Sequence, residues 1–312
     1  MKVLLIGTGY MAREYAKVLQ GLKLPFDVVG RGKEKSLEFK ALYKDVPVFE
    51  GGLEHFKPTG QYTHGIVSSN VDYLATHTRR LIDLGIKNIL LEKPGGTNLK
   101  EIKDVSDYAS KNNARVIIAY NRRFYASVLK CRELLEADGG VTSFNFEFTE
   151  WTSSFADLPD NSVVKNNLLF ANSTHVIDLA FFLGGLPLKM SSFSSGRLDW
   201  HEKAIYSGAG KSEKGALFSY QANWQAPGRW SVEMLTKEHR FVFRPMEQLQ
   251  IQKINSVKIE PYELDDALDK QYKPGLFRQT QAFFKDPSDP GLLTIQQQAL
   301  NCGYYQQILD GN

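Results

Sequence analysis

A glycine-rich turn near the N-terminus most constrains the fold of this chain. Gly7 to Ala12 (Gly-Thr-Gly-Tyr-Met-Ala) follows the apolar run Val3 to Ile6 and opens an amphipathic stretch from Met11 to Leu22. In a strand, turn and helix context of this kind, the first glycine permits the bend and the second lets the backbone approach a pyrophosphate. The helix N-terminus then favours the negative charge. A turn without a ligand is the competing interpretation. We predict a nucleotide site that includes Gly7, Thr8, Gly9, Tyr10 and Met11.

Residues 1–124 alternate short apolar runs with helical patterns. Alternation of this kind is typical of βαβ units, and six strands with helical crossovers form a doubly wound parallel sheet. Ligands of such sheets gather outside the carboxyl ends of the strands. We therefore predict an α/β fold whose first domain, residues 1–124, is a dinucleotide-binding Rossmann domain. The predicted strands are Val3 to Ile6, Phe26 to Val29, Val46 to Phe49, Gly65 to Ser68, Ile89 to Leu91 and Val116 to Ala119, and the predicted helices are Met11 to Leu22, Ser36 to Tyr43, Tyr73 to Leu84 and Leu99 to Lys111.

The pattern changes after residue 124 to alternating segments rich in β-branched and aromatic residues. Short turns at Lys237-Glu238 and at Gly208-Ala209-Gly210 indicate hairpins, so we predict an α+β domain over residues 125–312 with a mostly antiparallel sheet. We expect the last predicted helix to pack back onto the body of the protein. The predicted strands are Val141 to Thr152, Lys203 to Ser207, Ala216 to Trp224, Ser231 to Thr236, Arg240 to Arg244, Gln248 to Ile254 and Ser256 to Tyr262, and the predicted helices are Tyr125 to Leu135, Thr174 to Leu183 and Thr294 to Leu309.

Composition narrows the function classes. A chain of 312 residues can hold two domains, and 42% hydrophobic with 23% charged residues is ordinary for a globular protein. A net charge of +3 without a dense Lys/Arg block argues against nucleic acid and anionic membrane as partners. The sequence has no signal-peptide pattern and no long apolar run, so we expect a cytoplasmic protein. Cys131 and Cys302 are far apart and the histidines are isolated, so we expect no disulfide framework and no metal.

The end of the second predicted strand bears on the choice of cofactor. The chain reads Val28-Val29-Gly30-Arg31-Gly32-Lys33, without the acidic residue that would bind a ribose 2′-hydroxyl. Arg31 and Lys33 instead place cations where a 2′-phosphate would lie, which predicts that NADP is preferred and NAD possible. Solvated loop charges are the alternative. Ser68 and Asn70, at the end of the fourth predicted strand, are assigned to the same cofactor site.

Glu92-Lys93-Pro94 follows the buried strand Ile89 to Leu91. Pro94 cannot continue the strand, so the chain must turn there and can present Lys93 toward the crevice beside the nicotinamide. A cis peptide bond before Pro94 would hold that presentation. The alternative is an exposed turn lysine. We assign Glu92, Lys93 and Pro94 to the cofactor side of the site, with Lys93 as the candidate catalytic ammonium.

Three segments together resemble the Gfo/Idh/MocA oxidoreductases in order and spacing: Gly7 to Ala12, Glu92 to Pro94, and Asn172 to Asp178 (Asn-Ser-Thr-His-Val-Ile-Asp). Tyr120 to Phe124 also looks like the substrate-side loop of that family. The resemblance implies a Rossmann domain followed by a domain with a large open antiparallel sheet, and homodimers or homotetramers built on that sheet. It also implies hydride transfer between NAD(P) and a carbinol or ketone carbon of a sugar, a sugar derivative or a nucleotide-linked sugar.

The resemblance also implies catalytic roles. Lys93 matches the lysine whose ammonium stabilises charge on the reacting oxygen, and His175 matches a histidine of proton transfer. Asp178 is read as orienting the helix or the histidine. Many relatives carry an aspartate four residues before this histidine, where this chain has Ala171. Two hypotheses follow: Lys93 and His175 suffice for catalysis, or the chain is a non-catalytic NADP-binding sensor or regulatory protein.

The substrate is the least constrained part of the prediction. Asn121, Arg122 and Arg123 follow a strand end and could bind a phosphate or carboxylate, although one of two adjacent arginines is often in a structural ion pair. Trp151 offers a face for a sugar ring, or else is a core residue of a strand. Asn172 completes the predicted substrate contacts. The sequence favours an NADP-preferring sugar reductase, with biosynthesis of a modified or nucleotide-linked sugar as its setting.

Overall fold

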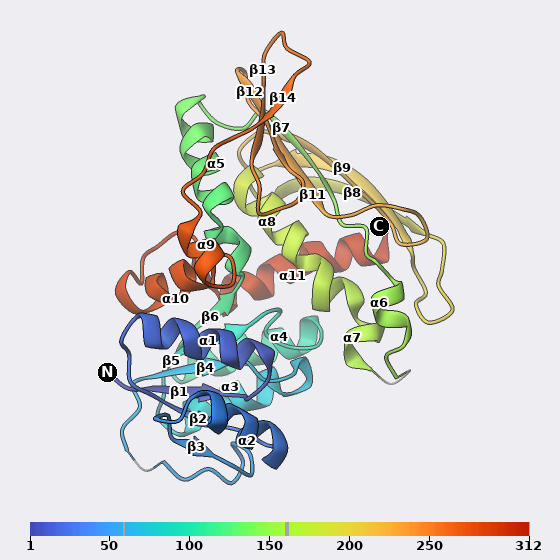
Figure 1. The fold of residues 1–312 in the computed structure, drawn as a ribbon. Helices are drawn as coiled ribbons and strands as arrows, with labels where there is room; N and C mark the ends of the chain where they lie inside the picture. Colours follow the sequence, from blue (N-terminus) through green and yellow to red (C-terminus); the bar gives the residue numbers. More distant parts are fainter. Residues whose placement is uncertain (59, 160–161, 312) are drawn as a thin grey trace. The chain divides into compact units, whose positions relative to one another are not determined.

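The computed structural model describes residues 1–58, 60–159 and 162–311, and these form two compact units (Figure 1). The first unit comprises residues 1–120 and 271–299, and the second comprises residues 121–270 and the chain from residue 300 onward. The predicted division into a dinucleotide-binding domain, 1–124, and a second domain, 125–312, stays a prediction. Each unit contains its own sheet and is described by itself.

The first unit is built on a seven-stranded sheet in the order β15-β6-β5-β4-β1-β2-β3. All its pairings are parallel except that of β15 with β6. Strand β1 is buried at all four positions, which is why strands of this kind read as continuous apolar runs. This confirms the predicted doubly wound sheet. The strands are β1 (Val3–Ile6), β2 (Phe26–Val29), β3 (Val48–Phe49), β4 (His64–Val67), β5 (Asn88–Glu92), β6 (Arg115–Ala119) and β15 (Leu293–Thr294).

Helices of the first unit bury one apolar face each. In α1 the buried residues Ala12, Tyr15, Ala16 and Leu19 recur every three or four positions. Helix α2 begins at Lys33, three residues before the predicted start, because Gly32 forms its N-cap. Helix α10 and the short strand β15 were not predicted, since two residues of strand leave no period to detect. The helices are α1 (Tyr10–Gly21), α2 (Lys33–Leu42), the 3₁₀ turn η1 (Val71–Tyr73), α3 (Leu74–Asp83), α4 (Leu99–Lys111) and α10 (Leu276–Lys285).

The second unit contains an eight-stranded sheet in the order β14-β13-β12-β11-β7-β10-β9-β8. Its pairings are antiparallel except for β7 with β10, which are parallel. This confirms the predicted mostly antiparallel sheet. The strands are β7 (Ser143–Glu147), β8 (Pro187–Ser195), β9 (Ile205–Ser212), β10 (Leu217–Asn223), β11 (Ser231–Leu235), β12 (His239–Phe243), β13 (Gln250–Lys253) and β14 (Ile259–Pro261).

Two sequence predictions about this sheet are wrong. Strand β8 was missed because its nine residues include four serines and no β-branched residue. Gly208 to Gly210, predicted as a hairpin turn, lies inside β9. A side chain at Gly208 would collide with the ring of Tyr220, and one at Gly210 would collide with Phe218. These glycines therefore leave room for aromatic rings of the neighbouring strand β10.

Helix α8 packs on the second sheet and is buried at nearly every position, with the Phe181 ring 5.5 Å from that of Phe146. A π-helical turn, η3, directly precedes α8. Helix α11 begins in the first unit and ends in the second. The helices are the 3₁₀ turn η2 (Asn121–Phe124), α5 (Ala126–Ala137), α6 (Ser153–Ala156), α7 (Val163–Asn166), η3 (Leu169–Ser173), α8 (Thr174–Gly184), α9 (Ala267–Gln271) and α11 (Ile295–Asp310).

Candidate functional site

The glycine turn lies between β1 and α1, and its two glycines have different reasons to be glycine. Gly7 has φ +119°, and a Cβ there would lie 2.9 Å from the backbone oxygen of Ser68. Gly9, the N-cap of α1, has φ −80°, and apart from its own neighbours in the chain no atom of the described residues lies within 4 Å of a Cβ built on it. Gly7 thus serves the bend, and Gly9 leaves open space in front of the helix N-terminus. That space suits a pyrophosphate.

A cavity of about 450 Å³ lies beside this turn, and we call it the cofactor cavity. Gly7, Thr8 and Gly9 line one side, and Ser68 and Asn70 line another. The side chain of Ser68 is buried and donates a hydrogen bond to the backbone oxygen of Ile6 at 2.9 Å. These residues all belong to the first unit, and the cavity is built largely from strand ends and backbone. Tyr10 and Met11 form the first turn of α1.

The rim of the cofactor cavity carries a positive charge. Arg31, Lys33 and Lys35 line it, together with one carboxylate, Glu34. The Arg31 guanidinium lies over the ring of Tyr73, 4.3 Å from its centroid. This stacking holds the guanidinium at the rim without neutralising its charge. The residues present therefore fit a nucleotide cofactor, and the excess of cations fits one that carries an additional phosphate.

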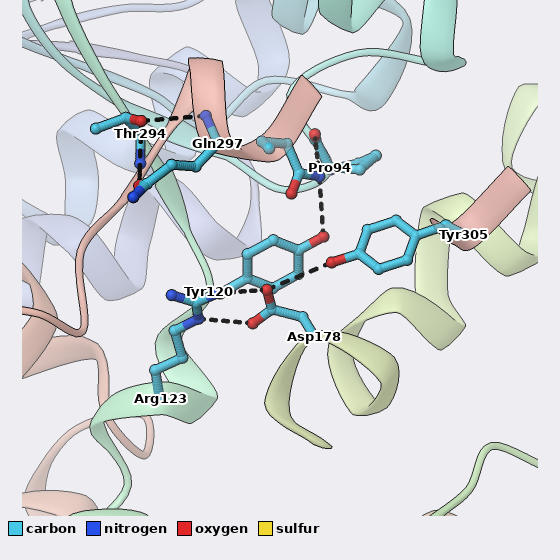
Figure 2. A network of polar contacts seen from close by, with 8 residues as sticks. Pro94, Tyr120, Arg123, Asp178, Thr294, Gln297 and Tyr305 are labelled. Atoms are coloured by element: carbon cyan, nitrogen blue, oxygen red, sulfur yellow. Dashed lines mark hydrogen bonds and ion pairs between the residues drawn. The ribbon is translucent and has the colours of Figure 1, made fainter. Parts of the chain in front are cut away.

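Glu92 ends β5, and the chain turns at Lys93 and Pro94 through a cis peptide bond. The Pro94 backbone oxygen accepts a hydrogen bond from Nε2 of Gln298 at 3.0 Å. The same nitrogen is 3.1 Å from the hydroxyl of Tyr120, and Gln298 is buried (Figure 2). Buried hydrogen bonds thus hold the turn in place from α11, which belongs to the first unit at this point.

The carboxylate of Glu92 is tied to α1. The Tyr15 hydroxyl donates a hydrogen bond to its Oε1 at 2.9 Å. Burial raises the pKa of Glu92, whereas the bond from Tyr15 and the positive charges of Lys93 and Lys273 act to lower it. Burial, followed by the charge of Glu92, raises the pKa of Tyr15 well above its usual value. The residue beside the candidate ammonium is therefore held by a buried side chain of α1.

His175 is the second residue of α8 and is buried, with its ring 6.0 Å from that of Trp230. The π-helical turn before it contains both Ala171 and Asn172. Asn172 Nδ2 donates a hydrogen bond to Glu150 Oε2 at 3.0 Å, and Ser173 Oγ donates one to Glu150 Oε1 at 2.6 Å. A buried carboxylate thus anchors the turn that leads into the histidine helix. Single-turn π-bulges of this kind are frequent at functional sites.

Glu150 was not singled out from the sequence. Burial raises its pKa, while the hydrogen bonds from Ser173 and Asn172 and the charge of Arg229 act to lower it. A signal was present, however: Phe144, Phe146 and Phe148 are buried at alternate positions of β7 and its extension, and Glu150 continues that phase. A carboxylate at a strand position whose side chain points into the core indicates either a buried ion pair or a functional site.

The two adjacent arginines have different partners. Arg123 donates two hydrogen bonds to Asp178, from Nε to Oδ2 at 2.8 Å and from Nη2 to Oδ1 at 2.6 Å. The Tyr305 hydroxyl is 3.4 Å from the same Oδ1 (Figure 2). Asp178 therefore anchors α8 rather than facing a ligand. The Arg122 guanidinium instead lies over the ring of Trp230, 4.8 Å from its centroid.

Trp151 is 58% exposed, and its Nε1 donates a hydrogen bond to the Gly228 backbone oxygen at 3.1 Å. It is therefore not a core residue of the strand, which leaves the sugar-stacking interpretation open. Asn121 is buried at the start of η2. Arg229, which lies 4.3 Å from both the Trp151 and the Trp230 ring centroids, was not predicted. We call Arg122, Glu150, Asn172, Arg229 and Trp230 the Trp230 cluster; all five belong to the second unit.

Comparison with known proteins agrees with this arrangement. Residues 1–120 match the model of the GFO_IDH_MocA family, described as an oxidoreductase family with an NAD-binding Rossmann fold. Among curated proteins, oxidoreductase cns1 of Cordyceps militaris is 21% identical over 205 residues, which are 61% of this chain. The chain spans about a quarter of the length of that curated relative, as the match covers 25% of it.

Solved structures share the fold over the full chain. Levoglucosan dehydrogenase in complex with NADH and levoglucosan is 17% identical with a TM-score of 0.81, covering 100% of this chain and 96% of that one. An oxidoreductase from Agrobacterium radiobacter, in complex with NAD⁺, L-tartaric acid and magnesium, is 11% identical with a TM-score of 0.79 and the same coverage. UDP-N-acetylglucosamine 3-dehydrogenase from Acidithiobacillus ferrooxidans is 13% identical with a TM-score of 0.76, covering 100% and 97%.

Over residues 1–120 the chain therefore matches the NAD-binding Rossmann domain of the Gfo/Idh/MocA oxidoreductases. Within residues 1–58, 60–159 and 162–311, no helix is long and apolar enough to cross a membrane. Over the same residues, no group of three or more histidine, cysteine, aspartate or glutamate side chains is placed to hold a metal ion.

Proposed function

We propose that the protein transfers a hydride between a nicotinamide cofactor and a carbinol or ketone carbon of a sugar or sugar derivative. The observation that carries this proposal is the position of Lys93, directly after β5 in the unit that contains the cofactor cavity. In parallel sheets this edge is where ligands bind. Two of the proteins with this fold are named as dehydrogenases of levoglucosan and of a nucleotide-linked amino sugar, which supports a sugar as substrate.

The roles of the residues follow from their chemistry. The bound cofactor supplies or accepts the hydride. In reduction, the carbonyl oxygen gains negative charge, which the Lys93 ammonium stabilises before giving the oxygen a proton. His175 assists as acid or base because imidazole titrates near neutral pH. With alanine at position 171, a substrate hydroxyl or a water completes the relay. We favour reduction, in the biosynthesis of a modified or nucleotide-linked sugar, because NADPH pools usually drive reduction.

A Lys93→Met variant tests this chemistry. NADPH oxidation would be followed by absorbance with a panel of keto sugars, and we expect the variant to lose about a hundredfold or more of the turnover. Its NADPH affinity should stay within about threefold, since the methylene stem is kept. Lys87→Met, just before the amino end of the same strand, is the matched control and should be fully active. Equal turnover by Lys93→Met and wild type would remove the proposed role of the ammonium.

The second candidate function is a non-catalytic NADP sensor or regulatory protein, and the observation that favours it is Ala171. A sensor would bind NADPH yet oxidise it with none of the sugars, and Lys93→Met would then change nothing measurable. Retention of both Lys93 and His175 supports the enzyme.

We also propose that NADP is preferred over NAD. Arg31 and Lys33 at the rim of the cofactor cavity support this, because guanidinium and ammonium groups bind a 2′-phosphate. Binding of NADPH and NADH would be titrated by cofactor fluorescence, and Arg31→Ala should weaken NADPH binding about tenfold while leaving NADH unchanged. Lys44→Ala is the control, since Lys44 is exposed and outside the cavity lining. Equal affinities for the two cofactors would contradict the preference.

We further propose that copies associate through the second sheet as a homodimer or homotetramer. Phe193 on β8 is 69% exposed and Leu217 on β10 is 62% exposed, and they support an apolar contact face. Light scattering on Phe193→Glu should show smaller particles than wild type, and a monomeric wild type would refute the proposal. A cytoplasmic location stays a prediction from the sequence.

A further inference from the structure

Two guanidinium groups lie over the ring of Trp230 in the second unit. The Arg122 guanidinium carbon lies 4.8 Å from its ring centroid, and that of Arg229 lies 4.3 Å from it. Trp230 itself is buried, and its ring is 6.0 Å from that of His175. Two positive charges are thus held one aromatic ring away from the proposed proton-transfer residue, inside one unit. Stacking on an aromatic face fixes a guanidinium in orientation and leaves its N–H groups available.

These two charges are incompletely matched by acids. Arg229 Nη1 is 3.6 Å from Glu150 Oε2, an oxygen that already accepts a hydrogen bond from Asn172. Arg122 has no carboxylate oxygen within 4.0 Å among the described residues, and its buried Nε has no hydrogen-bond partner there. Glu247 acts on Arg229 only at longer range, and the charge of Arg122 opposes that of Arg229.

A buried N–H without an acceptor costs free energy, and so does the approach of two like charges. Arg123 shows the contrast, because its guanidinium is fully engaged with Asp178 through two hydrogen bonds. An anionic ligand would relieve both costs at Arg122 and Arg229 at once. Guanidinium groups suit planar carboxylates and tetrahedral phosphates, since two N–H groups can bind two oxygens.

We propose that the substrate carries an anionic group, a carboxylate or a phosphate ester, and that Arg122 and Arg229, whose guanidinium groups both lie over the Trp230 ring, bind it. This rests on the proposed function, because it concerns the substrate of that reaction. The sequence suggested Arg122 and Arg123 together as the residues that bind an anion. The proposal instead assigns this role to Arg122 and Arg229, which is more than a hundred positions away in the chain. The neutral part of the sugar would then be placed toward His175.

The test is a binding measurement that does not depend on catalysis. Tryptophan fluorescence of the full chain with saturating NADP would be titrated with glucose, galactose and mannose, with their uronic acids, and with their 6-phosphates. We expect at least one anionic sugar to bind about tenfold or more tightly than its neutral parent. Binding by the uronic acid or by the phosphate identifies the source of the anion. Trp230→Phe should abolish most of the signal change.

Arg122→Gln and Arg229→Gln should each weaken binding of the anionic ligand about tenfold and leave binding of the neutral parent unchanged, because they remove the charge but keep a polar side chain. Arg197→Gln, an exposed arginine of the same unit, is the matched control and should bind like wild type. Circular dichroism melting confirms that each variant is folded.

The inference is wrong if no anionic sugar in the panel binds more tightly than its neutral parent. It is also wrong if both arginine variants bind the anionic sugar with normal affinity. Anion binding without NADPH oxidation would contradict the proposed function alone. NADPH oxidation with neutral sugars, together with no tighter binding of any anionic sugar, would contradict the inference alone.

Discussion

The cofactor cavity of the first unit and the Trp230 cluster of the second unit are assembled in different ways. The cofactor cavity is lined by residues between Ile6 and His77, most of them at strand ends and in the turns that follow. The Trp230 cluster combines side chains from η2, the segment after β7, the π-helical turn and the loop before β11. A site formed mostly by the backbone can therefore be recognised from one short segment of sequence. A site formed by side chains from distant segments can be recognised only in the tertiary structure.

The two regions also differ in what stabilises them. Space around Gly7 and Gly9 decides the shape of the cofactor cavity. Buried carboxylates and their arginine partners dominate the surroundings of the Trp230 cluster, with Arg123 on Asp178 and Arg229 near Glu150. Buried charges are costly when one partner is removed, whereas a glycine is costly to replace only where its backbone or surroundings demand it. Each region can therefore be tested separately.

The largest expected effect is on the buried ion pair. Arg123→Met leaves Asp178 charged and buried at 2% exposure, so we expect a loss of about 3–5 kcal/mol of unfolding free energy. Urea denaturation measures it. The double variant with Asp178→Leu should recover a large part, because it buries no unpaired charge. A loss under about 1 kcal/mol would mean that charge pairing does not hold this region together.

Substitution of the two glycines should separate folding from binding in the cofactor cavity. Gly7→Ala places a Cβ at φ +119° and 2.9 Å from the Ser68 oxygen, so we expect a loss of about 1–3 kcal/mol in stability. Gly9→Ala should leave the melting temperature nearly unchanged, yet weaken NADPH binding about tenfold or more by filling the space for the pyrophosphate. The assignment of the two glycines fails if both variants lose stability equally or if Gly9→Ala binds NADPH normally.

Tyr15→Phe removes the hydrogen bond to Glu92 and should cost about 1–3 kcal/mol at neutral pH, because a buried carboxylate loses a donor. The hydrogen bond from Tyr15 lowers the pKa of Glu92, which means that it stabilises the charged carboxylate more than the neutral acid. The loss of unfolding free energy in Tyr15→Phe should therefore become smaller in acid, where Glu92 is neutral. Tyr10→Phe on the same helix is the control, since Tyr10 is 64% exposed. A deficit that is constant with pH would argue against this coupling.

The smallest effect concerns the ionisation of Glu150. Burial raises the pKa of Glu150 above the usual 4.5. The contribution of Glu150 to the free energy of unfolding is therefore fully present in acid, and it is lost as pH rises through the raised pKa. Glu150→Gln lacks this titration and should gain about 1 kcal/mol on wild type over that interval. Unfolding free energies measured from acid to neutral pH test this. Parallel pH profiles of the two proteins would show that Glu150 does not titrate there.

The accuracy of prediction from sequence differed between the two sheets. Strands β1 and β2 were predicted at their observed bounds, because parallel strands covered on both faces are continuous apolar runs. Strand β8 was missed and β9 was interrupted too early at its glycines, since serines and glycines of an open sheet are chosen by cross-strand neighbours. The turns that carry Gly7 and Lys93 were recognised because the signal is local.

The sequence by itself determined the Rossmann-type first sheet and predicted a nucleotide site at the glycine turn, a lysine after the fifth strand and a histidine on a helix, because these segments are short and their backbone geometry is local. Only the tertiary structure decided which of Arg122 and Arg123 is bound to Asp178, that Glu150 anchors the turn before His175, and that Arg229 shares Trp230 with Arg122. The physical reason is that side-chain charges find their partners across long stretches of chain. Burial, which creates their cost and their specificity, exists only in the folded molecule.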